Sequence, residues 1–186
     1  KISISTARAG NVIGGGDWSE DRLIPDAIRA WQGDYSLSIR SPESIRPWQH
    51  VLEPLSGYLL LAEDTFDDSK LCTSYNFGPQ EKDITSVREV IDIVGVNLDM
   101  KKIEYTADSK DLHEASLLFL DINKSESLLG FKPKWGIQES VNRTIYWYQN
   151  FYEGRSALSL CEDDIWHYEE LGHQNASKSE VLQSDL

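Results

Sequence analysis

The sequence predicts an α/β fold built from short mixed strands and lid-like helices. Strand-type alternation and helix-type spacing of apolar residues follow each other along the chain, which is the pattern of that class. The 186 residues suffice for one domain with a buried core, and an apolar content of 40% excludes a disordered chain.

The first part of the chain is predicted to open on a strand, because residues 2–7 alternate apolar and polar side chains with no turn before them. Since a strand needs neighbours, we expect residues 1–16 to be the last strands and turn of an incomplete sheet, and the chain to be a fragment. Apolar residues then recur at helical spacing from Leu23 until Gly33 ends the helix. Residues 35–39 predict a short strand, and residues 40–49 a polar loop.

The rest of the chain is predicted to be mainly helical. The Ser86-x-x-Glu89 spacing is a capping box, and Gly95 is expected beyond the end of the helix that it opens. An earlier helix is expected to start at Pro54, with an apolar face that carries Leu55, Tyr58, Leu59, Ala62 and Phe66. The remaining expectations are extended segments at 74–77, 103–106 and 117–120, helices at 123–129, 138–152 and 163–171, and a loose tail at 172–186.

The net charge of the chain limits the kinds of molecule that it is expected to bind. Lys and Arg number 18 against 31 Asp and Glu, a net charge of −13. Such a chain has no broad basic field, so we expect no nucleic-acid partner and no anionic membrane surface. A phosphorylated ligand would have to be held by a few placed arginines. Cys72 and Cys161 lie far apart without CxxC spacing, which predicts a reducing, cytoplasmic location.

Motifs for autonomous catalysis are missing from the sequence. The histidines and cysteines show no metal-ligand spacing, and there is no nucleophile elbow, Walker loop or GxGxxG. Arg46 stands directly before Pro47, which holds it extended, and beside Trp48, where a guanidinium could grip a diphosphate or, alternatively, pair with a surface carboxylate. Asn11 follows a strand and either faces a ligand at the sheet edge or caps the Gly14–Gly16 turn. Arg22, by itself, is expected to be solvated.

Four motifs in order resemble the second half of the extended short-chain dehydrogenase/reductases that act on nucleotide sugars. They are Ala7-Arg-Ala-Gly-Asn-Val-Ile-Gly14, Arg22-Leu-Ile-Pro25, Ile45-Arg-Pro-Trp-Gln-His-Val51 and Tyr75-Asn-Phe-Gly78. Within that family, the run Arg46 to Leu55, His113-Glu-Ala115, Lys134-Trp135 and Asp164 to Tyr168 resemble the CDP-glucose 4,6-dehydratase branch. The resemblance covers residues 2 to about 171.

The resemblance implies the substrate-binding part of an extended Rossmann-type NAD(P)-binding fold, with residues 17–171 as the substrate-binding subdomain. Its strand end would touch the nicotinamide of NAD through the backbone near Ala9. The nucleotide sugar, CDP-glucose, would be held by Asn11, Arg22, Leu23, Pro25, Arg46 and His113. Pro47 replaces the Asp that most relatives carry, and the stretch before His113 has only Lys110 where many relatives have a second arginine.

The family's glycine-rich NAD fingerprint and Tyr-x-x-x-Lys pair are absent from the printed sequence. We therefore expect no catalytic residue in this chain and no activity from it alone. The resemblance also implies a homo-oligomer or pairing with the missing N-terminal half. Two other interpretations remain open: a related NAD-dependent nucleotide-sugar epimerase or decarboxylase, and a truncated, non-catalytic sugar-nucleotide-binding domain.

Overall fold

Short strands in four pairs make up the β structure of the chain. The computed structural model describes residues 2–100, 102–106 and 116–184, and within them each sheet has two strands. Three pairs are parallel and one is antiparallel. The parallel pairs are β1 (Thr6–Ala9) with β6 (Ser74–Phe77), β2 (Asn11–Ile13) with β5 (Trp48–His50), and β3 (Leu37–Ile39) with β8 (Ile103–Tyr105). The antiparallel pair is β4 (Ile45–Arg46) with β7 (Thr85–Ser86).

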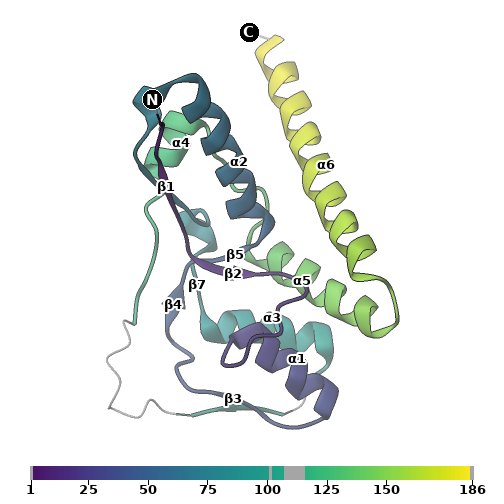
Figure 1. Ribbon diagram of the computed structural model, residues 1–186. Coiled ribbons are helices and arrows are strands. Elements are labelled where there is room, and N and C mark those ends of the chain that lie inside the picture. The colour runs from purple at the N-terminus through teal and green to yellow at the C-terminus, as the bar shows by residue number, and fades with distance from the viewer. Residues whose placement is uncertain (1, 101, 107–115, 185–186) are drawn as a thin grey trace.

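Helices α1, α3 and α5 lie close to the β2–β5 and β3–β8 pairs, and α6 extends away from the strands (Figure 1). Their bounds are α1 Leu23–Gly33, α2 Leu52–Asp67, α3 Val87–Leu98, α4 Asn123–Leu129, α5 Ile137–Tyr152 and α6 Ala157–Ser184, with 3-10 turns η1 Ser69–Leu71 and η2 Glu81–Asp83. No helix in the described part of the chain combines the length and apolarity that crossing a membrane requires.

Two apolar clusters form the core. The larger one joins α1, α3 and α5, and its fully buried members include Ile28, Ile91 and Val141. The smaller one joins α2, β6 and α4 through Leu61, Phe77 and Leu129, and is extended by Tyr75 and Phe131. The chain is thus an α/β structure, and the expected fold class is confirmed at this level.

Local sequence explains where several helices begin and end. The capping box of α3 is present: the Ser86 hydroxyl accepts from the Glu89 N–H at 3.2 Å, and the Glu89 carboxylate accepts from the Ser86 N–H at 2.8 Å. Helix α4 ends as expected at Gly130, whose φ of +67° is left-handed. Helix α1 also ends where expected, although Asp34, and not Gly33, adopts the left-handed conformation.

Some boundaries differ from the expectation. Gly95 lies inside α3, because Asp99 rather than a glycine takes the left-handed position after Leu98. The polar loop expected at 40–49 contains β4 and β5, which are too short to show a period of two. The opening strand is found at Thr6–Ala9, and Ile2 and Ile4 before it are exposed. The last helix starts at Ala157 and runs on to Ser184, where the sequence predicts a loose tail from 172.

The apolar face predicted for α2 does not face the core. Leu55, Leu59 and Phe66 are 47%, 73% and 89% exposed, and the buried positions are instead Glu53, Pro54, Gly57, Leu61 and Thr65. The physical reason is a close approach of the helix to β6. A Cβ on Gly57 would lie 2.3 Å from the Phe77 ring, so the small side of α2 faces the strand and the apolar stripe faces outward.

Replacing Gly130 by alanine is expected to destabilise the chain by about 1 kcal/mol, because a Cβ strains the left-handed backbone. The substitution isolates this strain, since a Cβ at Gly130 would meet no atom within 4 Å. Urea unfolding measures the cost. Gly130→Asn is the control and should cost less, because asparagine tolerates this conformation; equal stability of the wild type and Gly130→Ala would contradict the assignment.

Candidate functional site

A cavity of about 1010 Å³ lies between β2, the start of α1, the end of β3 and β4. This volume suits a small-molecule ligand of nucleotide size. The cavity brings together five of the predicted substrate-binding residues, which come from three separate parts of the chain: Asn11, Arg22, Leu23, Pro25 and Arg46.

Asn11 begins β2 and stands opposite Trp48 of β5 in the parallel register. The residue before it has to be glycine, since a Cβ on Gly10 would lie 2.4 Å from the carbonyl oxygen of Pro47. This contact draws the β1–β2 connection against the Arg46-Pro47-Trp48 run. The cavity wall is therefore formed by two chain segments that are distant in sequence.

Arg46 is a buried arginine in the cavity wall, with 8% of its surface exposed. It stands on β4 opposite Thr85 of β7, and its Nη1 donates to the carbonyl oxygen of Ile45 at 2.8 Å. Pro47 after it favours the extended backbone that β4 adopts. The guanidinium is thereby held in a restricted place, which favours bidentate recognition of an anion.

Arg22 precedes the first turn of α1 with an extended backbone, and Leu23 and Pro25 lie in that turn. Its Nη1 bonds the carboxylate of Asp17 at 3.4 Å, and its side chain is 62% exposed. An exposed ion pair of this kind contributes little to stability and can be exchanged for a ligand phosphate. The positive end of the α1 dipole lies at this side of the cavity, together with the carboxylates of Asp17, Asp21 and Asp26.

The loop between β2 and α1 is held in place by aromatic side chains of α5. The ring of Trp147 packs on Gly15, where a Cβ would lie only 2.0 Å from the ring. Trp18 meets Tyr148 edge-on with a centroid distance of 5.2 Å, and the Tyr148 hydroxyl donates to the carbonyl oxygen of Asp17 at 2.5 Å. Burial raises the pKa of Tyr148, so the hydroxyl stays protonated as a donor.

One further arginine lines the cavity and was missed by the sequence analysis. Arg40 directly follows β3, is exposed, and lies among the cavity residues. Its position after the end of a strand, where α/β folds place ligands, is the feature of the sequence that could have indicated it.

The two remaining predicted site residues are Ala9 and His113. Ala9 ends β1 opposite Phe77, is half-buried, and adjoins the cavity residue Gly10 without lining the cavity itself. His113 lies outside the described residues. Among the residues that the structure describes, no group of three His, Cys, Asp or Glu side chains is arranged to hold a metal ion.

Behind the cavity, buried polar groups connect β5 and α2 to α5 and α6. Glu53 is fully buried and accepts from the backbone N–H of Trp135 at 2.7 Å and from the Tyr168 hydroxyl at 2.8 Å. Burial raises the pKa of Glu53, although these hydrogen bonds act against the shift. Arg143 on α5 bonds one carboxylate oxygen of Asp164 on α6, with Nε at 2.8 Å.

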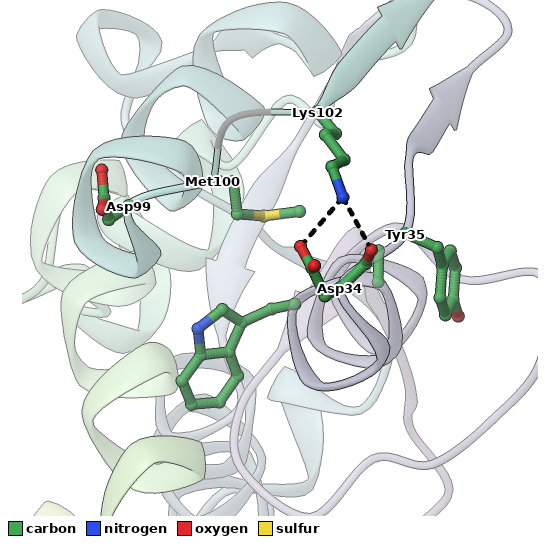
Figure 2. Close-up of a pocket in the computed structure, with 7 residues that line it drawn as sticks. Asp34, Tyr35, Asp99, Met100 and Lys102 are labelled. Carbon is green, nitrogen blue, oxygen red and sulfur yellow. Dashed lines mark hydrogen bonds and ion pairs between the residues drawn. The ribbon is translucent and has the colours of Figure 1, made fainter.

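A second cavity, of about 170 Å³, lies where α1 and α3 end (Figure 2). Asp34 and Asp99 are the left-handed residues that follow the two helices, and both line it. Lys102 Nζ spans the cavity edge to Asp34, bonding its carbonyl oxygen at 3.0 Å and its carboxylate at 3.1 Å (Figure 2). None of the predicted binding residues lies here, so we assign this cavity to the packing of the two helix ends.

Comparison with known proteins gives a relative of similar sequence. The chain is 40% identical over 169 residues to the CDP-glucose 4,6-dehydratase of Salmonella typhimurium, and this match covers 90% of the chain and 47% of the dehydratase. The chain thus spans about half the length of that relative. No family model matches the chain.

Solved structures share the fold at lower identity. The UDP-glucuronic acid 4-epimerase of Bacillus cereus, in complex with UDP-glucuronic acid and NAD, superposes with a TM-score of 0.68 at 18% identity, over 81% of this chain and 46% of the epimerase. The dTDP-glucose 4,6-dehydratase of Streptomyces venezuelae, with NAD bound, gives 0.67 at 21% identity, over 80% and 44%. The chain therefore has the fold of about half of a Rossmann-type epimerase or dehydratase.

His50, on β5 behind the cavity, is expected to make the protein sensitive to acid. Its burial, and then the charge of Arg143, lower its pKa from 6.5 to about 3. The folded state therefore keeps His50 neutral, while the unfolded state binds a proton below pH 6.5. Stability contributed by this group is present above pH 6.5 and is lost as the pH falls toward 3, by about 2–3 kcal/mol between pH 7 and 4.5.

Urea unfolding of the wild type and of His50→Asn at pH 7 and pH 4.5 tests this. The variant should be less stable at pH 7 but should lose less stability on acidification. The raised pKa of Glu53 acts in the opposite direction in both proteins and cancels in the difference. The same loss in wild type and variant would show that His50 is not the acid-sensitive group.

Proposed function

We propose that this chain is the nucleotide-sugar-binding part of an NAD-dependent CDP-glucose 4,6-dehydratase. The observation that carries the proposal is the cavity in which Asn11, Arg22, Leu23, Pro25 and Arg46 meet. The family resemblance implies these same residues as the contacts of the nucleotide sugar. The 40% identity to a CDP-glucose 4,6-dehydratase supports the same assignment.

Arg46 is proposed to bind the diphosphate of the substrate. The chain carries a net charge of −13, so an anionic ligand gains nothing from its overall field and must be attracted locally. Arg46 supplies a buried guanidinium in the cavity wall, and Arg22, which is paired with Asp17, supplies a second guanidinium for which a ligand phosphate can compete. Two parallel N–H···O bonds from one guanidinium fit a phosphate better than a single ammonium does.

Asn11 and Gly10 are proposed to lie nearest the sugar and NAD. They follow Ala9 at the carboxyl end of β1, where an α/β sheet meets its ligands, and both line the cavity. The backbone near Ala9 would contact the nicotinamide, which would supply hydride transfer when bound. This chain's own residues would bind the nucleotide sugar and orient it, and orientation alone can contribute a large part of a rate enhancement.

An epimerase that acts on nucleotide sugars is the second candidate. Its supporting observation is that an epimerase structure superposes on the chain as well as a dehydratase structure does, with TM-scores of 0.68 and 0.67. The fold therefore does not separate the two activities. The reaction product distinguishes the two activities, because a dehydratase yields a 4-keto-6-deoxy sugar and an epimerase yields a sugar of unchanged composition.

Arg46→Lys should weaken the binding of CDP-glucose roughly ten- to a hundredfold, because lysine keeps the charge but loses the planar pair of donors; a charged hydrogen bond contributes about 1.5–3 kcal/mol. Titration calorimetry of the chain with CDP-glucose measures the change. Arg155→Ala, which removes an arginine of the α5–α6 region away from the cavity, is the control and should leave the affinity unchanged. An unchanged dissociation constant for Arg46→Lys would mean that this arginine does not hold the diphosphate.

The purified chain with CDP-glucose and NAD is expected to form no 4-keto-6-deoxy product, although it binds the sugar nucleotide. The reason is that the printed sequence contains no Tyr-x-x-x-Lys pair and no glycine-rich NAD fingerprint. Mass spectrometry of the reaction mixture provides the measurement, and a longer protein that also contains these motifs is the positive control. Product from the chain alone would overturn the division of roles proposed here.

A further inference from the structure

Arg40 is one of three arginines that line the cavity. It directly follows β3, and the end of that strand is bound to β8: the Thr106 N–H and hydroxyl donate to the carbonyl oxygen of Ile39 at 2.9 and 3.2 Å. Both Arg40 and Thr106 line the cavity. The backbone is thus anchored at the residue directly before Arg40.

The other two arginines of the cavity already have partners. Arg22 bonds the Asp17 carboxylate, and Arg46 bonds the Ile45 carbonyl oxygen. Arg40 makes no hydrogen bond or ion pair with any residue that the structure describes, although acidic side chains outnumber basic ones in the chain. Its donors are therefore available to a ligand without the loss of an existing bond.

The surroundings of Arg40 suit a neutral polar group. Hydroxyl side chains line the cavity near it, whereas the carboxylates of the cavity come from the loop before α1 and from α1 itself. The hydroxyl residues are Ser38, Ser41, Ser44, Thr106 and Ser116. The cavity reaches from the β2–β5 pair to the β3–β8 pair, which lie apart in Figure 1. With the sugar at Asn11 and the diphosphate at Arg46, as proposed above, the part of the cavity beside β3 and Arg40 is left for the nucleobase.

We propose that Arg40 selects cytosine among the pyrimidine bases of the substrate, an inference that rests on the proposed nucleotide-sugar function of this cavity. The adjacent N3 and O2 atoms of cytosine are both hydrogen-bond acceptors, and two parallel N–H donors of a guanidinium match them. Uracil and thymine carry a hydrogen on N3, so the same guanidinium would meet a donor there. A site built around such a match rejects the base that lacks the acceptor, because its donors are left without a partner.

Titration calorimetry of the chain with CDP-glucose and with UDP-glucose tests the proposal. The wild type should prefer CDP-glucose roughly ten- to a hundredfold, the discrimination expected of one bidentate contact to a base. In Arg40→Ala this preference should fall to about threefold or less, mainly through weaker binding of CDP-glucose. Arg40→Lys retains the charge without the fork and should lose the preference too, which separates base reading from a general charge effect.

Each other outcome is decisive. Equal weakening of both sugar nucleotides in Arg40→Ala would identify a phosphate contact and overturn the proposal, as would a wild type that binds both equally well. A wild type that binds neither CDP-glucose nor UDP-glucose would contradict both the proposed function and this inference. The Arg155→Ala control should keep the wild-type preference, and urea unfolding should show that every variant is folded before its binding is compared.

Discussion

A single buried carboxylate connects the helices on which the candidate site depends. Glu53 on α2 is fully buried and accepts from the backbone before α5 and from Tyr168 on α6, so one side chain joins three parts of the chain. A carboxylate deprived of such donors in a buried place costs several kcal/mol. Since β5 directly precedes α2, this arrangement also sets the position of Trp48, which forms part of the cavity wall.

The electrostatics of the chain are organised by location and not by overall charge. Arg22, Arg40 and Arg46 converge on one cavity from three separate segments, and the three carboxylates that also line it, those of Asp17, Asp21 and Asp26, all lie before or within α1. An arginine within a cavity attracts an anion at short range, where screening by salt is weak, while distant surface carboxylates are largely screened. A chain of net charge −13 can therefore still attract an anion at the arginines of this cavity.

The sequence predicted the parts of the fold that depend on neighbouring residues. The Ser86–Glu89 capping box and the Gly130 helix end are examples, because each is decided within one turn of helix. The exposed face of α2 was not predictable in this way, since it follows from the close approach of Gly57 to Phe77, a contact between distant segments. The same holds for β4 and β5, whose two and three residues are defined by pairing with β7 and β2. For the site, the resemblance to a family selected five residues that share the cavity, whereas Arg40, outside every motif of that resemblance, was found only from the structure.

The position of Trp18 has a spectroscopic consequence. This indole is 44% exposed on the loop that brings Asp17 and Arg22 to the cavity, and it packs edge-on against Tyr148. The emission wavelength of an indole depends on its contact with water, so a ligand that reorders this loop changes the emission of Trp18. Trp48 lines the cavity and can respond to the same ligand, whereas Trp135 is buried outside the cavity and Trp166 lies on α6. The intrinsic tryptophan fluorescence of the chain can therefore be used to follow the entry of an unlabelled sugar nucleotide as it occurs.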